Sequence, residues 1–288
     1  MSSTDSILLI GSGGMLGRAW QQMLDQKGQS YHAISRSELD LADPKNLDAV
    51  IGEGVKMVIN CGAYTDVDGA ESDEALANQI NGESVGILGQ RCQAVGATLV
   101  HYSTDYVFNG QQTQPYATDQ PHDPINAYGR SKALGETRLR ESGANHLIFR
   151  TSWLYAPWGK NFVLTIAKAA AQRDTLRVVD DQLGRPTSCE HLAKSSCALI
   201  QAGATGTYHI TDGGQCTWHA FASMIAAHAN PACTVEPCSS EEYPRPAVRP
   251  AYSVLDLSRT EARIGPMSDW KTNLANVLDR LAQPTNIK

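Results

Sequence analysis

The sequence has no apolar run that approaches the length needed to cross a membrane, which argues against helical membrane spans. It also has no excess of basic residues. The formal net charge is −6 and the isoelectric point is near 5.7, so the chain carries no basic footprint for nucleic acid. The first residues, Met1 to Ser6, are polar and include an acid, so we expect no signal peptide. Together these absences indicate a cytoplasmic protein that acts on small molecules.

Patterns typical of disulfides and metal sites are missing as well. The cysteines form no CxxC pair, and none is spaced from a histidine in the way that zinc sites require. A scattered, odd-numbered set indicates reduced thiols, and Cys61 and Cys92 lie in patterns typical of core packing. The seven cysteines stand at positions 61, 92, 189, 197, 216, 233 and 238.

What the sequence does contain is an alternation of short apolar runs and helical patterns. Its 288 residues are 42% hydrophobic and 19% charged, an ordinary globular composition. Short apolar runs that end in glycines are typical of buried parallel strands. The alternation predicts an α/β fold with a Rossmann-type, doubly wound parallel sheet. The predicted strands cover 7–10, 31–35, 55–60, 98–103 and 147–152; the predicted helices cover 15–24, 75–95 and 270–281, with another starting at Asp43–Pro44.

The regularity weakens after Trp153, and four prolines fall between Pro237 and Pro250. We therefore predict two parts. A dinucleotide-binding domain covers 1–153, with short return segments near 175–180 and 207–211, and a smaller C-terminal substrate-binding lobe covers mainly 154–288.

A glycine-rich turn follows the first predicted strand and opens the first predicted helix. Its spacing is GxxGxxG, and Gly13 also places a glycine in the GxG position. Such glycines make the tight turn, let the backbone approach a pyrophosphate and let the helix pack on the strand. The new helix then points free N–H groups at the phosphates. We predict a dinucleotide contact at Gly11, Gly13, Gly14, Met15, Leu16 and Gly17.

The end of the second predicted strand bears on which cofactor is used. An acid there would bind a ribose 2′-hydroxyl, but this chain has Ser35 and Arg36. An arginine beside a small hydroxyl suits a 2′-phosphate, so NADPH is the first choice and NADH stays open. We expect Asp40 and Leu41 to lie near the adenine.

Tyr128 and Lys132 lie four residues apart in a helical stretch, so their side chains share one face. An ammonium beside a phenol lowers the pKa of the phenol from about 10, and we expect this at Tyr128. A tyrosine tuned in this way passes a proton to or from an alcohol or ketone near neutral pH. Thr104 follows a strand end, where side chains line the crevice of such a sheet. We predict that Thr104 binds a substrate carbonyl, Tyr128 donates the proton, and Lys132 tunes Tyr128 and holds the nicotinamide ribose.

Several stretches carry a family resemblance over nearly the whole chain. Besides the glycine turn and Tyr128-Gly129-Arg130-Ser131-Lys132, they cover 60–71, 101–108, 149–155 and 181–187. The Val-Asp-x-Ala-Glu and Arg-Thr-Ser-Trp stretches within them are far more specific than the glycine turn. On these motifs the chain resembles the extended short-chain dehydrogenase/reductases, and within them the dTDP-4-dehydrorhamnose reductases.

The resemblance implies that NAD(P)H reduces the C4 ketone of dTDP-4-dehydro-L-rhamnose to give dTDP-L-rhamnose, a step in making cell-surface polysaccharide. Thr104, Tyr128 and Lys132 match the family's catalytic residues, and Asn81 matches an asparagine with a structural or proton-relay role. The cofactor-lining stretch matches Ala63, Tyr64 and Thr65. The expected substrate contacts are Val67, Thr104, Asp105 and Trp153, and we add Asn161, Gln182 and Arg249 as candidate contacts to the nucleotide or its diphosphate.

The chain also departs from the family pattern. Some members dimerise through magnesium held by acidic residues near the glycine turn and near Glu190. Here Met15 stands in the turn and His191 follows Glu190, and a thioether does not supply the oxygen ligand that magnesium prefers. We therefore expect no metal site, while a homodimer without metal stays open. Arg185 adds a cation that could touch a diphosphate.

Other functions remain open at this stage. A dehydratase of the same superfamily needs a glutamate where this chain has Tyr106, and an epimerase needs a second acid/base group that the sequence does not offer. A reductase for a different NDP-4-keto-6-deoxysugar is an alternative. So is a non-catalytic subunit resembling the regulatory beta subunit of methionine adenosyltransferase.

Overall fold

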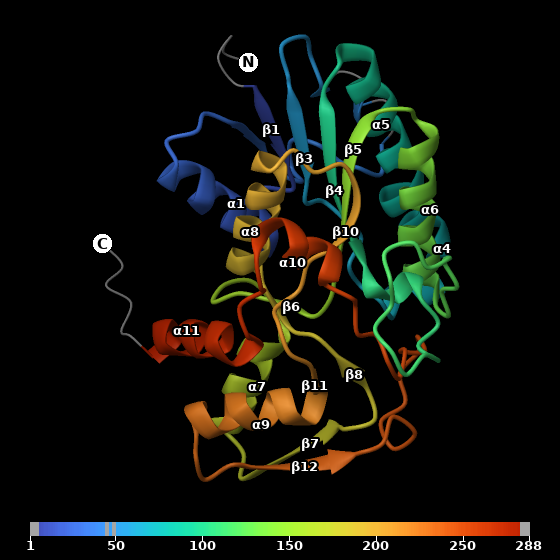
Figure 1. The fold of residues 1–288 in the computed structure, drawn as a ribbon. Coiled ribbons are helices and arrows are strands. Elements are labelled where there is room, and N and C mark those ends of the chain that lie inside the picture. The colour runs from blue at the N-terminus through green and yellow to red at the C-terminus, as the bar shows by residue number, and fades with distance from the viewer. Residues whose placement is uncertain (1–5, 44–45, 48–49, 283–288) are drawn as a thin grey trace.

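The computed structural model describes residues 6–43, 46–47 and 50–282 (Figure 1). Its centre is a six-stranded parallel sheet in the order β10-β5-β4-β3-β1-β2. The chain runs from β1 to β2 on one side and then to β3 on the other, so the strand order reverses between β1 and β3. Ligands of open parallel sheets bind at such a point. The strands are β1 (Ile7–Ile10), β2 (His32–Ile34), β3 (Met57–Asn60), β4 (Thr98–Thr104), β5 (Asn145–Thr151) and β10 (Gly206–His209).

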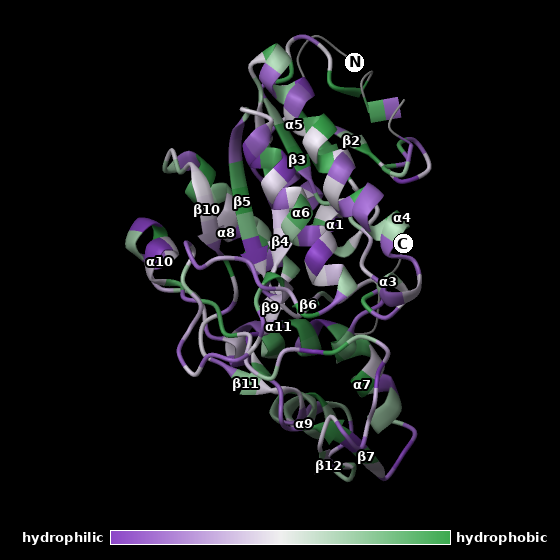
Figure 2. Cartoon of the chain, turned by 90° about the vertical axis from the view of Figure 1, so that its right-hand side faces the viewer, coloured by the Kyte–Doolittle hydropathy of each residue, from purple (hydrophilic) through white to green (hydrophobic). Residues whose placement is uncertain are grey.

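Both faces of the sheet are covered by helices. Alternate residues of a strand point to opposite faces. On β1, Leu8 and Ile10 pack with α5 (Ser84–Val95) and α6 (Ala127–Glu141), whereas Leu9 packs with α1 (Met15–Gln26) and α8 (Cys189–Gln201). Figure 1 shows these helix pairs on the two sides of the sheet, and in Figure 2 the helices α1, α5 and α6 carry both polar and apolar residues. The predicted doubly wound fold is confirmed.

The remaining helices complete the two faces and the lobe. Those whose bounds lie within the described residues are α3 (Gly69–Ser72), α4 (Glu74–Asn78), α7 (Phe162–Ala170), α9 (Trp218–Ala229), α10 (Ser258–Ile264) and α11 (Trp270–Ala282), with a 3₁₀ turn, η2 (Asp105–Val107). None of the helices in the described part of the chain is long and apolar enough to cross a bilayer.

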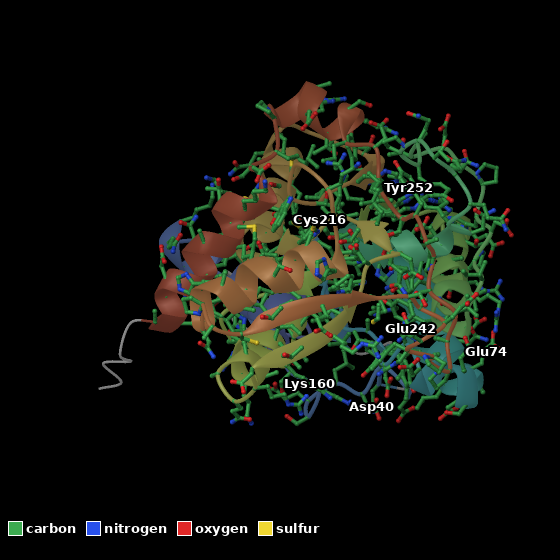
Figure 3. The ribbon with its side chains drawn as sticks, turned by 90° about the horizontal axis from the view of Figure 1, so that it is seen from below. Asp40, Glu74, Lys160, Cys216, Glu242 and Tyr252 are labelled. Carbon is green, nitrogen blue, oxygen red and sulfur yellow. The ribbon has the colours of Figure 1, made fainter. Side chains whose placement is uncertain are left out.

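A smaller lobe forms below the sheet, with its own apolar cluster. The strands β7 (Thr175–Val179) and β12 (Thr234–Cys238) pair in parallel, and α7, α9 and α11 pack around the cluster. Figure 3 looks onto this lobe, with the two strands side by side. Short strand pairs join β6 (Leu154–Tyr155) to β9 (Thr187–Ser188) and β8 (Leu183–Gly184) to β11 (Cys216–Thr217).

The sequence predicted the first half of the fold more closely than the second. The five predicted strands match β1 to β5 to within two residues at either end. The helix predicted over 75–95 is α4 followed by α5, with a π-helical turn, η1 (Gln79–Glu83), between them. The segment near 175–180 was expected to return to the first domain and instead pairs with β12, because its apolar residues fill the lobe's cluster. The helix start at Asp43–Pro44 lies outside the described residues.

Candidate active site at the carboxyl ends of the central strands

The glycine turn connects β1 to α1 at the point where the strand order reverses. Gly11 has φ +77°, and a Cβ on it would lie 2.6 Å from the amide nitrogen of Gly62, after β3. A Cβ on Gly17 would lie 2.2 Å from the carbonyl oxygen of Gly11, so these two positions require glycine. By contrast, no atom of the described residues lies within 4 Å of a Cβ on Gly13, so the backbone there is open to close approach.

The start of α1 suits an anion. Gly14 is its N-cap, and no side chain in the described part of the chain caps this helix. Its first-turn N–H groups are therefore free to bind a diphosphate. The Met15 carbonyl accepts a hydrogen bond from Trp158 Nε1 (3.1 Å), and the Leu16 side chain is buried in the core, so these two residues brace the turn.

The end of β2 contains a group that the sequence analysis missed. Glu38 Oε2 accepts hydrogen bonds from the Ser35 amide (2.9 Å) and the Ser35 hydroxyl (2.6 Å), and these bonds lower the pKa of Glu38. Arg36 is exposed beside it. This turn therefore offers one cation and one carboxylate. The Ser-x-x-Glu spacing of a capping box could have predicted the Glu38 contact.

The adenine side of the turn was predicted at Asp40 and Leu41. Asp40 is exposed, and its carboxylate accepts a hydrogen bond from the Ala42 amide (3.0 Å). Leu41 is buried, close to Gly62. The structure therefore places Leu41 beside the segment that follows β3, while the contact of Asp40 with the adenine stays a prediction.

The segment after β3 is clamped by Asn81 from the π-helical turn. Asn81 Oδ1 accepts from the Tyr64 amide (2.9 Å), and its Nδ2 donates to the Tyr64 carbonyl (3.0 Å) and to Ser131 Oγ (2.9 Å). Ser131 in turn donates to the Tyr128 carbonyl (2.8 Å). Asn81 thus fixes the predicted cofactor-lining stretch, Ala63 to Thr65, to the helix that carries Tyr128.

Thr104, Asp105 and Tyr128 come together at the end of β4. The Thr104 hydroxyl donates to Asp105 Oδ1 (2.9 Å) and accepts from the Tyr106 amide (3.2 Å). Tyr128 enters from α6, and its ring meets the Tyr106 ring edge-on at 6.1 Å. A Cβ on Gly129 would lie 2.1 Å from the Tyr106 carbonyl, so α6 begins in direct contact with this turn.

The expected lowering of the Tyr128 pKa is wrong for this arrangement. Burial and the nearby Asp105 carboxylate raise the pKa of Tyr128, and a hydrogen bond with Thr104 only partly opposes them. Lys132 points elsewhere: its Nζ donates to the Tyr102 carbonyl (2.6 Å) and lies 3.3 Å from His101 Nε2. Burial lowers the pKa of Lys132 to about 8, against the charge of Glu136. Tyr128 is therefore a neutral phenol at ordinary pH, which suits a proton donor.

Asp105 is the other perturbed group at this site. Its side chain is 2% exposed, and its Oδ2 has no hydrogen-bond partner among the described residues. Burial raises the pKa of Asp105 to about 6, although the nearby Ser253 hydroxyl and the hydrogen bond from Thr104 act in the lowering direction. A buried acceptor without a donor is costly, so this oxygen suits a ligand hydroxyl.

Trp153 lies where the sheet meets the lobe. It is the one non-glycine residue with positive φ (+48°) in the described ranges, and its ring stacks on Trp218 at 3.6 Å. A Cβ on Gly184 would lie 2.7 Å from the Trp153 ring. The backbone conformation is uncommon for a bulky residue, and it holds the indole against the lobe.

The three predicted nucleotide contacts are all engaged by the protein itself. Asn161 caps α7, with Oδ1 accepting from the Leu164 amide (3.1 Å) and Nδ2 donating to the Ala156 carbonyl (2.9 Å). Gln182 Nε2 donates to Ser240 Oγ (2.8 Å). The structure thus gives Asn161 a capping role, and its expected contact with the nucleotide or its diphosphate stays a prediction.

Arg249 reaches the site through a residue that the sequence analysis did not single out. Its Nη1 donates to Asp68 Oδ1 (2.5 Å), and Arg245 Nη2 donates to Asp68 Oδ2 (2.5 Å). Asp68 follows the predicted contact Val67, which is half-buried. The Val-Asp-x-Ala-Glu stretch could have marked Asp68. Arg249 is thereby brought next to Tyr106, with which it also forms a hydrogen bond.

Two further residues lie away from this cluster. Arg185 lines a separate cavity of about 280 Å³ with Asp256 and Glu261, and its contact with a diphosphate stays a prediction. Glu190 binds Arg280 Nη1 through both carboxylate oxygens (2.7 Å each).

The chain matches the family described as the RmlD substrate binding domain over residues 5–283. It belongs to this family. A relative in Burkholderia thailandensis, named dTDP-4-dehydrorhamnose reductase, is 39% identical over 284 residues, covering 92% of this chain and 95% of the relative. A relative in Streptomyces niveus, named dTDP-4-keto-6-deoxy-D-glucose reductase, is 37% identical, covering 96% and 98%.

A solved structure is also similar to this chain. The dTDP-4-dehydrorhamnose reductase of Bacillus anthracis, solved in complex with NADP, superposes with a TM-score of 0.92 at 34% identity, covering 96% of this chain and 99% of that one.

Proposed function

We propose that this chain is a dTDP-4-dehydrorhamnose reductase, which uses NADPH to reduce the C4 ketone of dTDP-4-dehydro-L-rhamnose to dTDP-L-rhamnose. One observation carries the proposal: the neutral phenol of Tyr128 lies with Thr104 and Asp105 at the strand ends beside a glycine turn that suits a dinucleotide. Relatives with this printed activity match over nearly the full chain. The step belongs to deoxysugar synthesis for cell-surface polysaccharide, and we expect it in the cytoplasm.

The residues present fit a nicotinamide dinucleotide. The turn from Gly11 to Gly17 and the uncapped start of α1 would hold the diphosphate, and Ala63 to Thr65 would line the crevice. Arg36 would bind a 2′-phosphate, while Glu38 beside it would oppose that charge, so NADH stays a possible second cofactor. When bound, the reduced nicotinamide supplies the hydride.

The protein's own groups supply the proton and the orientation. Tyr128 donates its phenolic proton to the C4 oxygen, because its raised pKa keeps it protonated until charge develops there. Thr104 hydrogen-bonds the same oxygen. Lys132 would hold the nicotinamide ribose and would contribute positive charge to the site.

The sugar nucleotide would lie between the sheet and the lobe. Asp105 Oδ2 would accept from a sugar hydroxyl, and Trp153 would pack against the sugar. Val67, Gln182 and Arg249 would contact the nucleotide. We propose that the lobe within 154–288 mainly binds this substrate, and that the domain at 1–153 binds the cofactor.

The experiment is NADPH consumption by the purified chain with dTDP-4-dehydro-L-rhamnose, beside the Tyr128→Phe variant. We expect the variant to lose most turnover, at least a hundredfold, while it still binds NADPH with unchanged affinity. Equal turnover by the two proteins would reject Tyr128 as the proton donor. No turnover by either, together with tight binding to another protein, would favour the regulatory alternative.

A second candidate substrate follows from the Streptomyces niveus relative, whose printed name is a reductase of dTDP-4-keto-6-deoxy-D-glucose. The two ketones differ in sugar configuration, and residue types alone do not choose between them. Running both substrates side by side separates the two functions by their kcat/KM values.

The same preparation, passed over a sizing column with and without EDTA, tests for a homodimer without metal.

A further inference from the structure

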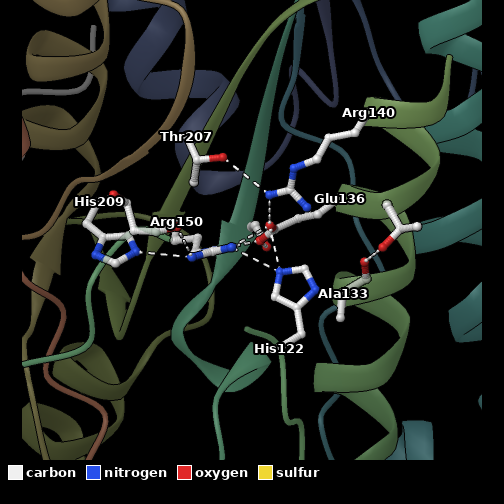
Figure 4. Close-up of polar contacts among 10 residues, drawn as sticks. His122, Ala133, Glu136, Arg140, Arg150, Thr207 and His209 are labelled. Carbon is white, nitrogen blue, oxygen red and sulfur yellow. Dashed lines mark hydrogen bonds and ion pairs between the residues drawn. The ribbon is translucent and has the colours of Figure 1, made fainter. Parts of the chain in front are cut away.

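A buried carboxylate lies one helical turn beyond Lys132. Glu136 is fully buried, and Figure 4 shows its contacts. Its Oε1 accepts from Ser103 Oγ (2.6 Å) and Arg150 Nε (2.8 Å). Its Oε2 accepts from Arg150 Nη2 (2.8 Å) and Arg140 Nη2 (2.7 Å), and it lies 2.9 Å from His122 Nε2. This one side chain therefore connects β4, β5, α6 and the segment before α6.

The position of Glu136 links it to the candidate catalytic residues. Tyr128, Lys132 and Glu136 follow one another at intervals of four on α6, so they lie along one face of the helix. Ser103, which donates to Glu136, directly precedes Thr104. The carboxylate thus ties the end of β4 to the helix that carries Tyr128.

Arg150, which binds Glu136, also contacts the segment before α6. Arg150 Nη1 donates to the Thr118 carbonyl (3.0 Å) and lies 3.4 Å from His209 Nε2. Arg150 is itself 1% exposed, so its charge depends on Glu136 for neutralisation.

Lys132 is also buried, at 2% exposed, and its hydrogen bonds go to neutral groups. Several ionisable groups surround Lys132 and Glu136, and most of them are cationic or neutral. They are His101 on β4, Arg140 on α6, Arg150 on β5, His209 on β10 and His122. Glu136 lies on the same helix face as Lys132 and supplies a negative charge deep in this group.

We propose that Glu136 is a positioning residue of this site, which fixes Thr104 relative to Tyr128 and supplies the counter-charge that keeps Lys132 an ammonium. The role in turnover rests on the proposed function; the role at Lys132 does not. The charge of Glu136 raises the pKa of Lys132 against the effect of burial, which agrees with this arrangement.

The charge is tested by NMR titration of protein labelled with ¹³C-lysine, with the Lys132 signal assigned from Lys132→Met. In Glu136→Gln we expect the Lys132 midpoint to fall by about one pH unit or more. In Arg140→Gln, which removes a partly exposed cation beside Glu136, we expect it to rise. Glu141→Gln is the matched control, because Glu141 is exposed on the same helix and pairs with Arg138. In this variant the Lys132 midpoint should not move.

Glu136→Gln leaves the Arg150 charge less well neutralised, so this variant could fail to fold. Circular dichroism checks its folding, and Arg140→Gln then decides alone. If the Lys132 midpoint stayed unchanged in Arg140→Gln and, where it folds, in Glu136→Gln, the charge role would be overturned. These outcomes do not depend on turnover, so they remain readable if the proposed reaction is wrong.

The positioning role is tested by Ser103→Ala, which removes the bond from β4 but keeps the carboxylate. We expect kcat to fall about tenfold with little change in the KM for NADPH, and the alkaline limb of the pH–rate profile to stay in place. In Arg140→Gln the same limb should move to higher pH. Unchanged kcat in Ser103→Ala would reject the positioning role.

Discussion

At the residue scale, this site contains two buried ionisable groups whose pKa values lie on either side of neutral pH. The pKa of Asp105 is raised to about 6 by burial, and the pKa of Lys132 is lowered to about 8 by burial. Tyr128, between them, stays neutral because its pKa is raised. Over this interval the site presents a carboxylate, a phenol and an ammonium, and the neutral phenol is the state that the proposed proton donation uses.

Asp105 makes a prediction about stability. Its folded-state pKa lies above the value near 4 of an unfolded chain, so the folded state binds the proton more tightly. That contribution to stability is fully present below about pH 4 and is lost as the pH rises through about 6. Asp105→Asn should therefore unfold with a free energy about 1–3 kcal/mol higher than wild type at pH 8, with a smaller difference at pH 4.

Denaturant titrations at the two pH values measure this difference, and turnover of the same variant should fall at least tenfold. If Asp105→Asn were less stable than wild type at pH 8, the buried carboxylate of Asp105 would not destabilise the folded chain.

At the element scale, the residues that form strands were readable from the sequence, and the contacts of their ends were not. Runs such as Ile7–Ile10 are too short and apolar to be anything but buried strands next to glycine turns. The direction of Lys132 is set by the Tyr102 carbonyl, thirty residues away on another element, and helical spacing to Tyr128 does not contain that information. The π-helical turn at Asn81 likewise follows from its bonds to Tyr64 and Ser131.

The junction of β1 and α1 gives a matched pair of variants. Gly17→Ala places a methyl group against the Gly11 carbonyl, and backbone has to move, so we expect a loss of about 2 kcal/mol or more in stability. Gly13→Ala meets no atom of the described residues, so its stability should stay within about 0.5 kcal/mol of wild type while NADPH affinity falls.

Thermal unfolding and NADPH fluorescence titration on both variants separate the two effects. If Gly13→Ala bound NADPH as wild type does, the diphosphate would not approach this turn.

At the scale of the whole molecule, the lobe is tied back to the first half through Asp68. Arg245, Arg249 and the Ala247 amide all donate to its carboxylate, and Asn126 Nδ2 donates to the Val248 carbonyl (2.8 Å). The hydrogen bond from Arg249 has the largest effect among the interactions that hold the pKa of Asp68 well below its usual range. The pairing therefore stabilises the fold above about pH 4 and weakens as the pH falls below that.

Asp68→Asn should loosen residues 245–249 without unfolding the sheet. We expect faster amide hydrogen exchange in this segment and a KM for the sugar nucleotide raised at least fivefold, with the KM for NADPH nearly unchanged. Glu74→Gln is a suitable control, because it breaks an exposed ion pair with Arg130 and leaves Asp68 and its partners unchanged. Equal changes in both KM values would place the segment nearer the cofactor than the lobe.

The stack of Trp153 on Trp218 has an optical consequence. Two indoles 3.6 Å apart and 13° from parallel couple their electronic transitions, so part of the near-ultraviolet dichroism of the chain comes from this pair. One partner precedes the lobe and the other belongs to it. The protein thus carries a built-in spectroscopic reporter, without any attached dye, at the boundary where the sugar would bind.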